Sequence, residues 1–283
     1  MHFGRIRVPF LWVLIAFTCL TACQRIERRV DEIRDKINNS EQETENPNLL
    51  FGNPSNATTN PTNSDNYLLV KRSFVISYNN GRGTANWAAW RTTLNDLGES
   101  LPRPGFEPDP SLPWGFTTIK PTDYSGSGYD RGHLVPSADR FGDPESNAET
   151  FHMTNIVPQA AALNQYPWEK LESYSRGIVR RGSDAYTIAG VYGNQRQLRG
   201  RVTAPTNCWK IIVILPPGGS INDVNGQTRI IAVDMPNSGS IAKDRWQKYR
   251  TSVRSIEERT GYDFLSNLPQ ELQDVLETRV DDQ

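Results

Sequence analysis

Runs of β-branched and aromatic residues predict several strands, and they begin only after residue 66. Such side chains are typical of strands because they pack well on a pleated surface. The turn residues Asn79-Asn80-Gly81 follow the first run and predict that the chain reverses there. The predicted strands are Leu68–Tyr78, Tyr186–Tyr192, Trp209–Leu215 and Arg229–Val233.

Helical spacing and capping residues predict helices between these strands. Trp87–Leu97 predicts a short helix. A second helix runs from about Pro167 to Arg180, since proline lacks an N–H that the first turn does not need. A third covers Ser240–Thr260, with Ser240 as the N-cap and Gly261 as the terminator. Six prolines make residues 101–128 a loop. The irregular connections favour an α+β fold with a mixed, mainly antiparallel sheet and flanking helices.

The first 23 residues have the pattern of a secretory signal. Arg5 and Arg7 precede an apolar stretch, Val8–Leu20, that is too short and too soon followed by charge for a transmembrane helix. Leu20-Thr21-Ala22-Cys23 resembles the lipobox of bacterial lipoproteins. The resemblance implies that Cys23 is lipidated, so that the mature protein is exported and anchored to a membrane of the cell envelope. The alternative is an ordinary cleaved signal with a chance cysteine, which would leave a secreted or periplasmic protein.

Residues 24–66 predict a connection rather than a core. Ile26, Val30, Ile33 and Ile37 have helical spacing in a charged background, which predicts a short amphipathic stalk. From Asn38 onward the chain is rich in Asn, Ser, Thr, Pro and Glu, which cannot bury enough apolar surface to order itself. The sequence therefore predicts a flexible linker up to residue 66 and one folded domain over 67–283.

Composition supports a globular domain and excludes two other classes. Hydrophobic residues make up 36% of the chain and aromatics 10%, and the mean hydropathy of −0.59 excludes a protein with several membrane spans. Two of the three cysteines precede residue 24, which excludes a disulfide framework. Cys208 lies in a predicted buried strand, so we expect it to be packed and inert.

Charge predicts a local rather than a global anion-binding surface. Residues 67–283 carry 24 basic and 24 acidic side chains. Residues 176–201, however, carry six arginines against Asp184 alone, a local charge of +5. Such a patch could hold phosphates through contacts that ignore sequence. The alternative is a solvated charged face.

One segment contains the side chains that phosphodiester chemistry needs. Asp130-Arg131-Gly132-His133 is followed by Asn155, Asn164, Glu172 and Arg176. Of the three histidines, His2 lies in the signal and His152 stands between Phe151 and Met153, where packing is expected. His133 is therefore the candidate general base. Asn164 offers a neutral carbonyl oxygen of the kind that Mg²⁺ accepts while it keeps its waters. It could equally cap the following helix.

These residues together resemble the DNA/RNA non-specific endonuclease family, which are sugar-non-specific nucleases of the ββα-metal, or His-metal finger, class. The resemblance covers essentially all of residues 67–283. The segments that carry it are Tyr124–Asp139, Met153–Gln159, Leu163-Asn164-Gln165, Trp168, Leu171-Glu172 and Gly261–Ser266.

The resemblance implies a role for each matching residue. His133 would activate water, Asn164 would be the single protein ligand of Mg²⁺, with Mn²⁺ as the alternative, and Asn155 would support the site. Glu172 lies eight helical positions beyond Asn164, so we place it behind a metal-bound water or beside an arginine. The implied phosphate-binding residues are Arg131, Arg176 and Arg103, and the implied products carry 5′-phosphates.

Two other functions compete with a nuclease that takes DNA and RNA as substrates. One is a catalytically inactive nucleic-acid-binding envelope lipoprotein, and the other is a structural envelope lipoprotein with coincidental motifs. The set of His133, Asn164 and Glu172 argues against the first, because a binder needs none of these side chains. The second predicts that the protein binds neither metal nor DNA. The sequence leaves open a protein inhibitor, the oligomeric state and the preference between DNA and RNA.

Overall fold

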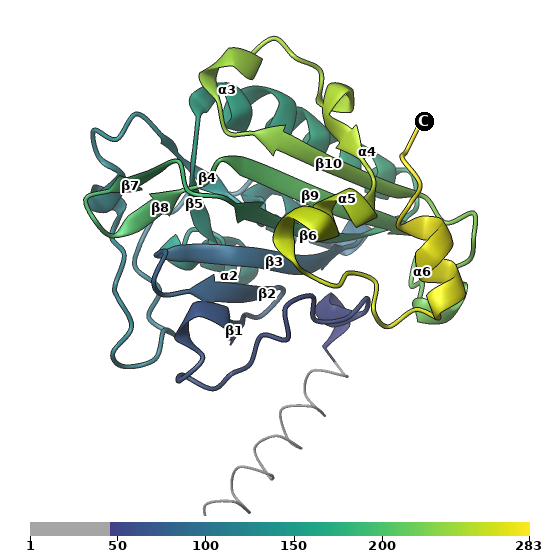
Figure 1. Ribbon diagram of the computed structural model, residues 1–283, viewed down its shortest axis with the longest axis horizontal. Coiled ribbons are helices and arrows are strands. Elements are labelled where there is room, and N and C mark those ends of the chain that lie inside the picture. The colour runs from purple at the N-terminus through teal and green to yellow at the C-terminus, as the bar shows by residue number, and fades with distance from the viewer. Residues whose placement is uncertain (1–45) are drawn as a thin grey trace, which may run out of the picture. The chain divides into compact units, whose positions relative to one another are not determined.

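A computed structural model describes residues 46–283 of the chain as one folded unit (Figure 1). The predicted signal peptide, Cys23 and the predicted stalk lie outside the described residues. Between residues 46 and 283, no helix combines the length and the apolar character that a membrane crossing requires.

A seven-stranded sheet in the order β1-β2-β3-β6-β9-β10-β11 forms the centre of the fold, and every neighbouring pair of strands is antiparallel. The prediction of an α+β fold with a mainly antiparallel sheet is thus confirmed. The strands are β1 (Tyr67–Val70), β2 (Val75–Asn79), β3 (Thr84–Thr92), β6 (Asp184–Tyr192), β9 (Asn207–Leu215), β10 (Ile230–Pro236) and β11 (Arg250–Thr251).

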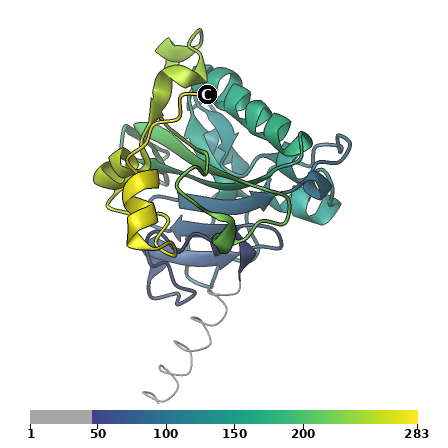
Figure 2. The same cartoon turned by 90° about the vertical axis from the view of Figure 1, so that its right-hand side faces the viewer.

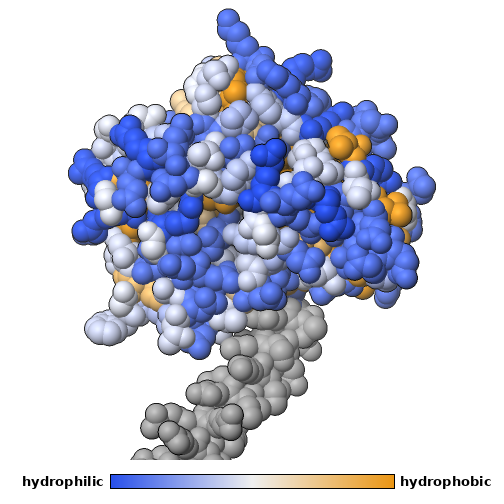
Figure 3. Space-filling model, in the orientation of Figure 1, coloured by the Kyte–Doolittle hydropathy of each residue, from blue (hydrophilic) through white to orange (hydrophobic). Residues whose placement is uncertain are grey.

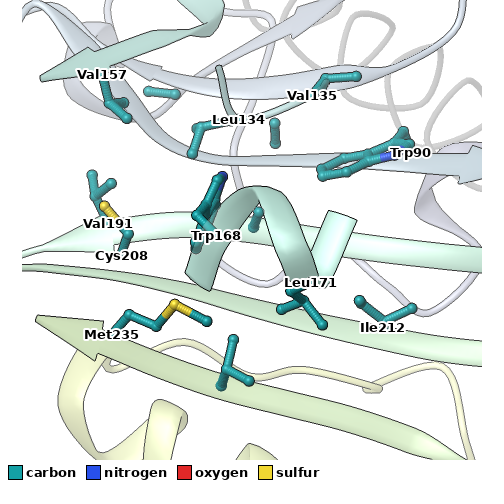
Figure 4. Packing of buried hydrophobic residues seen from close by; sticks show 14 of the residues in the cluster. Trp90, Leu134, Val135, Val157, Trp168, Leu171, Val191, Cys208, Ile212 and Met235 are labelled. Carbon is teal, nitrogen blue, oxygen red and sulfur yellow. The ribbon is translucent and has the colours of Figure 1, made fainter. Parts of the chain in front are cut away.

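Both faces of the sheet are covered, so its strands are buried on two sides. One cluster of buried side chains lies between the sheet and α4 (Glu169–Arg180), and a second lies between the sheet and α5 (Val253–Thr260) with α6 (Gln270–Leu276). Figure 2 shows α4 and the two yellow C-terminal helices on opposite sides of the sheet. In the first cluster, Leu171 of α4 and Trp168, which immediately precedes α4, pack over Cys208 and Ile212 of β9 (Figure 4). Cys208 is fully buried there, as its place in the sequence predicts.

Two predicted helices are wrong. Trp87–Leu97 is instead mostly part of β3, whose side chains alternate between the two buried faces, Trp87 on one and Trp90 on the other. Ser240–Thr260 is not one helix, because it contains two short 3₁₀ turns and β11 before α5 begins after its N-cap, Ser252. Gly261 does end α5, in a left-handed conformation with φ +72°.

The globular unit also begins earlier than predicted. The described part of the predicted linker packs on the sheet, because Leu49, Phe51 and Ala57 are buried in the second cluster. Its asparagines close turns rather than remain in solvent: the side chain of Asn53 accepts a hydrogen bond from the Ala57 amide at 3.0 Å. The described fold therefore includes residues 46–66, which the sequence analysis assigned to the linker.

Smaller elements complete the fold. They comprise the strand pair β4 (Asp130–His133) and β5 (Ile156–Gln159), the strand pair β7 (Arg196–Leu198) and β8 (Val202–Ala204), and the short helices α2 (Pro144–Glu149) and α3 (Ala161–Leu163). A wide π-type turn, Asn164–Trp168, joins α3 to α4 and contains Pro167. Such turns occur frequently at functional sites.

Candidate active site

A two-stranded hairpin positions the imidazole of His133. His133 ends β4 and lies opposite Ile156 of the antiparallel strand β5. Gly132 permits the pairing, because a Cβ at this position would lie 2.0 Å from the Gln159 Oε1 oxygen. Gly132 therefore leaves room for the Gln159 side chain of β5 to lie against β4.

Two phenylalanine rings enclose His133. The ring centroid of Phe151 lies 4.9 Å from that of the imidazole, edge-on, and the centroid of Phe106 lies at 5.4 Å. Nε2 is buried and has no hydrogen-bond partner in the described structure. Burial, together with the nearby charge of Arg103, lowers the pKa of His133 to about 3. The imidazole is therefore neutral at physiological pH and able to accept a proton.

The arginines Arg103 and Arg131 gather around the same two rings. The Arg103 guanidinium carbon lies 5.7 Å from the Phe151 ring centroid, and that of Arg131 lies 5.7 Å from the Phe106 centroid. Arg131 is two residues before His133 in β4, so the two side chains are on one face of the strand. The structure thus brings together the predicted base and two of the three predicted phosphate-binding residues.

Asn155 is completely buried and fixes the chain immediately after His133. Its side-chain oxygen accepts a hydrogen bond from the Val135 amide at 3.0 Å, and its side-chain nitrogen donates to the Val135 carbonyl at 3.0 Å. Its own carbonyl accepts a hydrogen bond from the Leu134 amide. The geometry makes Asn155 a positioning residue rather than a group that meets substrate.

Asn164 approaches the other end of the same strand. Its side-chain nitrogen donates to the Asp130 Oδ2 oxygen at 2.9 Å, and the Gln165 side chain donates to that oxygen at the same distance. Asp130 and His133 are the two ends of the four-residue strand β4, so Asn164 is tied through Asp130 to the strand that carries the imidazole.

The donor set at Asn164 fits a hydrated hard cation. Because the amide nitrogen is used by Asp130, the side-chain oxygen of Asn164 is the atom that remains for an ion. Across residues 46–283, no three His, Cys, Asp or Glu side chains gather as a closed metal cage. A single amide oxygen, with a carboxylate one hydrogen bond away, suits an ion such as Mg²⁺ that keeps most of its waters.

Glu172 lies over the sheet and pairs with a buried lysine that the sequence analysis missed. Its Oε1 oxygen is 3.0 Å from Lys210 Nζ, a strand β9 side chain that is only 1% exposed. The ammonium also lies 4.2 Å from the Trp168 ring centroid and 5.7 Å from that of Trp90. Burial raises the pKa of Glu172, although Lys210 and Arg176 oppose the shift. The predicted arginine partner is thus replaced by Lys210.

The structure does not present Arg176 as a phosphate ligand. Arg176 is 8% exposed, and its guanidinium donates to Asp139 Oδ1 at 3.0 Å and to Ser173 Oγ at 3.0 Å. The second oxygen of Asp139 accepts a hydrogen bond from Trp90 Nε1. Arg176 therefore joins α4 to the segment after His133, and its predicted role in binding phosphate is not supported by this geometry.

Other features of the site were also missing from the sequence analysis, although the chain held a signal for one of them. Lys210 is the single charged residue in a nine-residue strand that is otherwise apolar or neutral, which itself indicates a buried partner. Phe106 and Phe151 gave no comparable signal. His152 has the structural role that its neighbours predict, with its ring nitrogens 3.3 Å from Glu107 Oε1 and Lys71 Nζ.

Comparisons with known proteins agree with this geometry. A family model described as DNA/RNA non-specific endonuclease matches residues 51–271. A nuclease of Nostoc sp. is 46% identical over 235 residues, which are 82% of this chain and 85% of the relative. Human mitochondrial endonuclease G is 30% identical over 159 residues, about half of each chain. The crystal structure of an EndoG/EndoGI complex, at 21% identity, shares the fold with a TM-score of 0.65 and covers 80% of this chain and 92% of its own.

Proposed function

The chain belongs to the DNA/RNA non-specific endonuclease family and is a nuclease of the hydrolase class, and on this premise we propose the chemistry that its site performs. It is a metal-dependent endonuclease, indifferent to sequence and sugar, that hydrolyses DNA and RNA to products with 5′-phosphates. The observation that supports the proposal is that the strand β4 ends in the neutral imidazole of His133 and holds the Asn164 carboxamide through Asp130 at its other end.

His133 is the general base of this reaction. Its imidazole accepts a proton from the water that attacks phosphorus, while Phe106 and Phe151 fix the ring plane. The ring is uncharged before the reaction because burial and Arg103 disfavour the imidazolium. A negatively charged phosphate that enters beside Arg103 weakens this second effect, so substrate binding itself makes the imidazole more basic. A positioned base of this kind contributes about 10²–10⁴ in rate.

Two arginines complete the electrostatics of phosphoryl transfer. Arg103 and Arg131 extend beside His133, and neither takes part in an ion pair among residues 46–283. Their charges are therefore available to the non-bridging oxygens on which negative charge accumulates in the transition state.

A divalent cation, Mg²⁺ or Mn²⁺, would be held by the Asn164 side-chain oxygen and by water, with Asp130 fixing the amide. When bound, it would supply charge neutralisation at the phosphate and the leaving oxygen. Glu172, held by Lys210 at 3.0 Å, would offer its carboxylate to a water of that ion rather than to the ion itself.

Supercoiled plasmid and single-stranded RNA, each incubated with the protein, test this function. We expect both to be degraded with Mg²⁺, to be preserved by a chelator, and to be preserved when His133→Ala replaces the wild type. Digestion by the His133 variant at the wild-type rate would contradict the assigned base. Binding of the plasmid without cleavage under every condition would favour the inactive nucleic-acid-binding lipoprotein.

We also propose that the nuclease is exported and anchored to the cell envelope through lipidated Cys23. The lipobox-like segment Leu20–Cys23 supports this location. Cells fed with an alkyne-tagged fatty acid should label the wild type and the matched variant Cys19→Ser but not Cys23→Ser. Equal labelling of both variants would place the lipid elsewhere, and no labelling at all would favour a simple cleaved signal.

A further inference from the structure

The strand pair β7–β8 packs directly against the hairpin that carries His133. Leu198, Val202 and Ala204 share a buried cluster with Ile156, the residue that pairs with His133 in the register of β4 and β5. Figure 1 shows β7 and β8 at one edge of the molecule, beside β4 and β5. The pair is therefore a fixed extension of the active site.

The loop of residues 121–129 is hydrogen-bonded both to β4 and to the strand pair β7–β8. Arg131 of β4 donates to the Pro121 carbonyl at 2.8 Å, and Arg199, which follows β7, donates to the Ser125 carbonyl at 3.2 Å. The Tyr129 hydroxyl adds a hydrogen bond of 3.2 Å to the side chain of Gln195. Residues 121–129 thus hold the strand pair and the catalytic strand in a fixed relation.

The turn that joins β7 to β8 carries backbone strain at an arginine. The Arg201 amide donates to the Leu198 carbonyl at 2.9 Å, and the two residues between them, Arg199 and Gly200, have φ of +47° and +67°. Both central residues of such a turn favour glycine or asparagine. Arginine in the left-handed region is strained, and such strain is concentrated at functional sites.

The charge of this turn is uncompensated. Arg196, Arg199 and Arg201 are exposed, and the part of the chain that the structure describes gives none of them an ion pair. The nearby carboxylate Asp123 is occupied, since it caps its own turn by accepting a hydrogen bond from the Lys120 amide. Figure 3 shows strongly hydrophilic surface over the edge where Figure 1 places β7 and β8.

The six arginines of residues 176–201 therefore do not form one surface. Arg176 is a buried residue of α4, and Arg180 and Arg181 lie at the end of that helix. Only the three arginines of the β7–β8 turn extend the active site, and we define them as the arginine turn: Arg196, Arg199 and Arg201.

We propose that the arginine turn binds phosphates of the nucleic-acid strand that flanks the scissile bond. The proposal rests on the proposed nuclease function and adds a second contact region to it, outside the catalytic residues. Guanidinium groups without a carboxylate partner suit a polyanion, and contacts to phosphate carry no sequence preference. A membrane with anionic headgroups offers similar charge, but the rigid link to the catalytic strand favours the substrate.

Salt dependence of binding tests the proposal most directly. The affinity of the full chain with His133→Ala for a short DNA duplex is measured at several KCl concentrations and compared with the same chain carrying Arg196→Gln, Arg199→Gln and Arg201→Gln. Each lost phosphate contact should lower the slope of log K against log salt by about 0.9. Loss of three contacts lowers the ratio of the Kd at about 200 mM to that at about 50 mM salt by about 40-fold.

Two matched variants separate charge from structure. Lysine at the same three positions retains the cations and should restore the wild-type slope. Glutamine at Lys243, Lys248 and Arg259, three exposed cations elsewhere, should leave the slope unchanged. An unchanged slope in the arginine-turn variant would overturn the proposal, and so would an equal loss in the matched variant.

Failure of this proposal is distinguishable from failure of the nuclease assignment. If the wild type cleaves plasmid while the arginine-turn variant keeps the wild-type slope, the nuclease function stands and the second contact region does not exist. Vesicles of phosphatidylglycerol serve as the competing ligand. Vesicle binding that the arginine-turn variant loses, combined with an unchanged DNA slope, would assign the turn to a lipid surface and would also overturn the proposal.

Discussion

The two faces of the central sheet bury charge in different ways. On the face covered by α4, two cations and two carboxylates are paired: Lys210 with Glu172, and Arg176 with Asp139. On the opposite face, Arg254 alone faces two buried carboxylates, Glu257 at 3.0 Å and Glu277 at 2.6 Å. A balanced cluster can hold a carboxylate in place over a wide pH range, whereas an unbalanced one must take up a proton. Geometry is thus fixed on the face that carries the chemistry, and pH sensitivity is placed on the other.

The largest expected effect separates chemistry from stability on the catalytic face. His133→Ala should lower kcat by about 10²–10⁴, because the base is lost. The thermal midpoint should change little, since the imidazole donates and accepts no hydrogen bond among the described residues. Plasmid cleavage and calorimetry on the same sample measure the two quantities. A large fall in the thermal midpoint would mean that the His133 ring stabilises the fold. Chemistry and stability would then not be separate on the catalytic face.

A substitution that opens a cavity on the opposite face should lower stability and leave kcat nearly unchanged. Trp209 is fully buried there against Phe264, with ring centroids 5.1 Å apart. Trp209→Ala should lower the free energy of unfolding by about 3–5 kcal/mol. Below its melting temperature the variant should retain nearly wild-type kcat. Urea unfolding and steady-state kinetics provide the comparison, and a loss of kcat in fully folded protein would show that the two faces are coupled.

Substitution of Lys210, the residue after Trp209, should lower both kcat and the free energy of unfolding, because Lys210 lies on the catalytic face and is buried in the core. Lys210→Met removes the cation that pairs with Glu172 and should lower the free energy of unfolding by about 3 kcal/mol, since an unpaired buried carboxylate remains. Activity should fall mainly in kcat, and its pH profile should shift because the pKa of Glu172 rises further. Adding Glu172→Gln removes the unpaired charge, so the double variant should regain stability without regaining kcat. Recovery of kcat instead would contradict a positioning role for Lys210.

The smallest expected effect is on the pH dependence of stability, through the cluster of Arg254, Glu257 and Glu277. Burial and the neighbouring Glu257 raise the pKa of Glu277 to about 7, while the unfolded chain ionises near the ordinary value of 4.5. The contribution of Glu277 to stability is therefore fully present below about pH 4.5 and is lost as the pH rises through about 7. Glu277→Gln should flatten this decline, so that the variant gains thermal stability relative to the wild type between pH 5 and pH 8. A parallel pH dependence in both proteins would assign the decline to other groups.

The proximity of Asp130, Arg131 and His133 could be predicted from the sequence because these residues are neighbours in the chain. Asp130, Arg131 and His133 share one strand, so their spacing alone placed them together. The strands β6, β9 and β10 were predicted too, because continuous apolar runs bounded by turn residues are distinctive.

The two wrongly predicted helices are segments whose side chains pack into the buried clusters on both faces of the sheet. β3 is apolar on both of its faces, which removes the alternation that identifies a strand, and its alanines favour a helix. In residues 240–260 the helical spacing is real, but Ile241 and Trp246 belong to the core beneath α4 while Val253 and Ile256 belong to the opposite one. The chain must pass around the edge of the sheet between them, and a single straight helix cannot do so.

Long-range pairs account for what was missed in the site. Lys210 meets Glu172 across 38 residues, and Arg176 meets Asp139 across 37. No periodicity connects such positions. Only the tertiary fold determines that Arg176 is buried while Arg103 is exposed to solvent. The sequence alone predicted the same phosphate-binding role for both arginines.

The position of Lys210 in β9 has a consequence for the newly made polypeptide. Every motif side chain from Arg103 to Arg176 is synthesised before β9, the strand that lies between β6 and β10 in the sheet. Until β9 joins β6 and β10, Glu172 lacks its cation, and α4 lacks the apolar surface on which it rests. We therefore expect incomplete chains to be inert toward nucleic acid, so that the order of synthesis keeps a nuclease harmless until its last strands are in place.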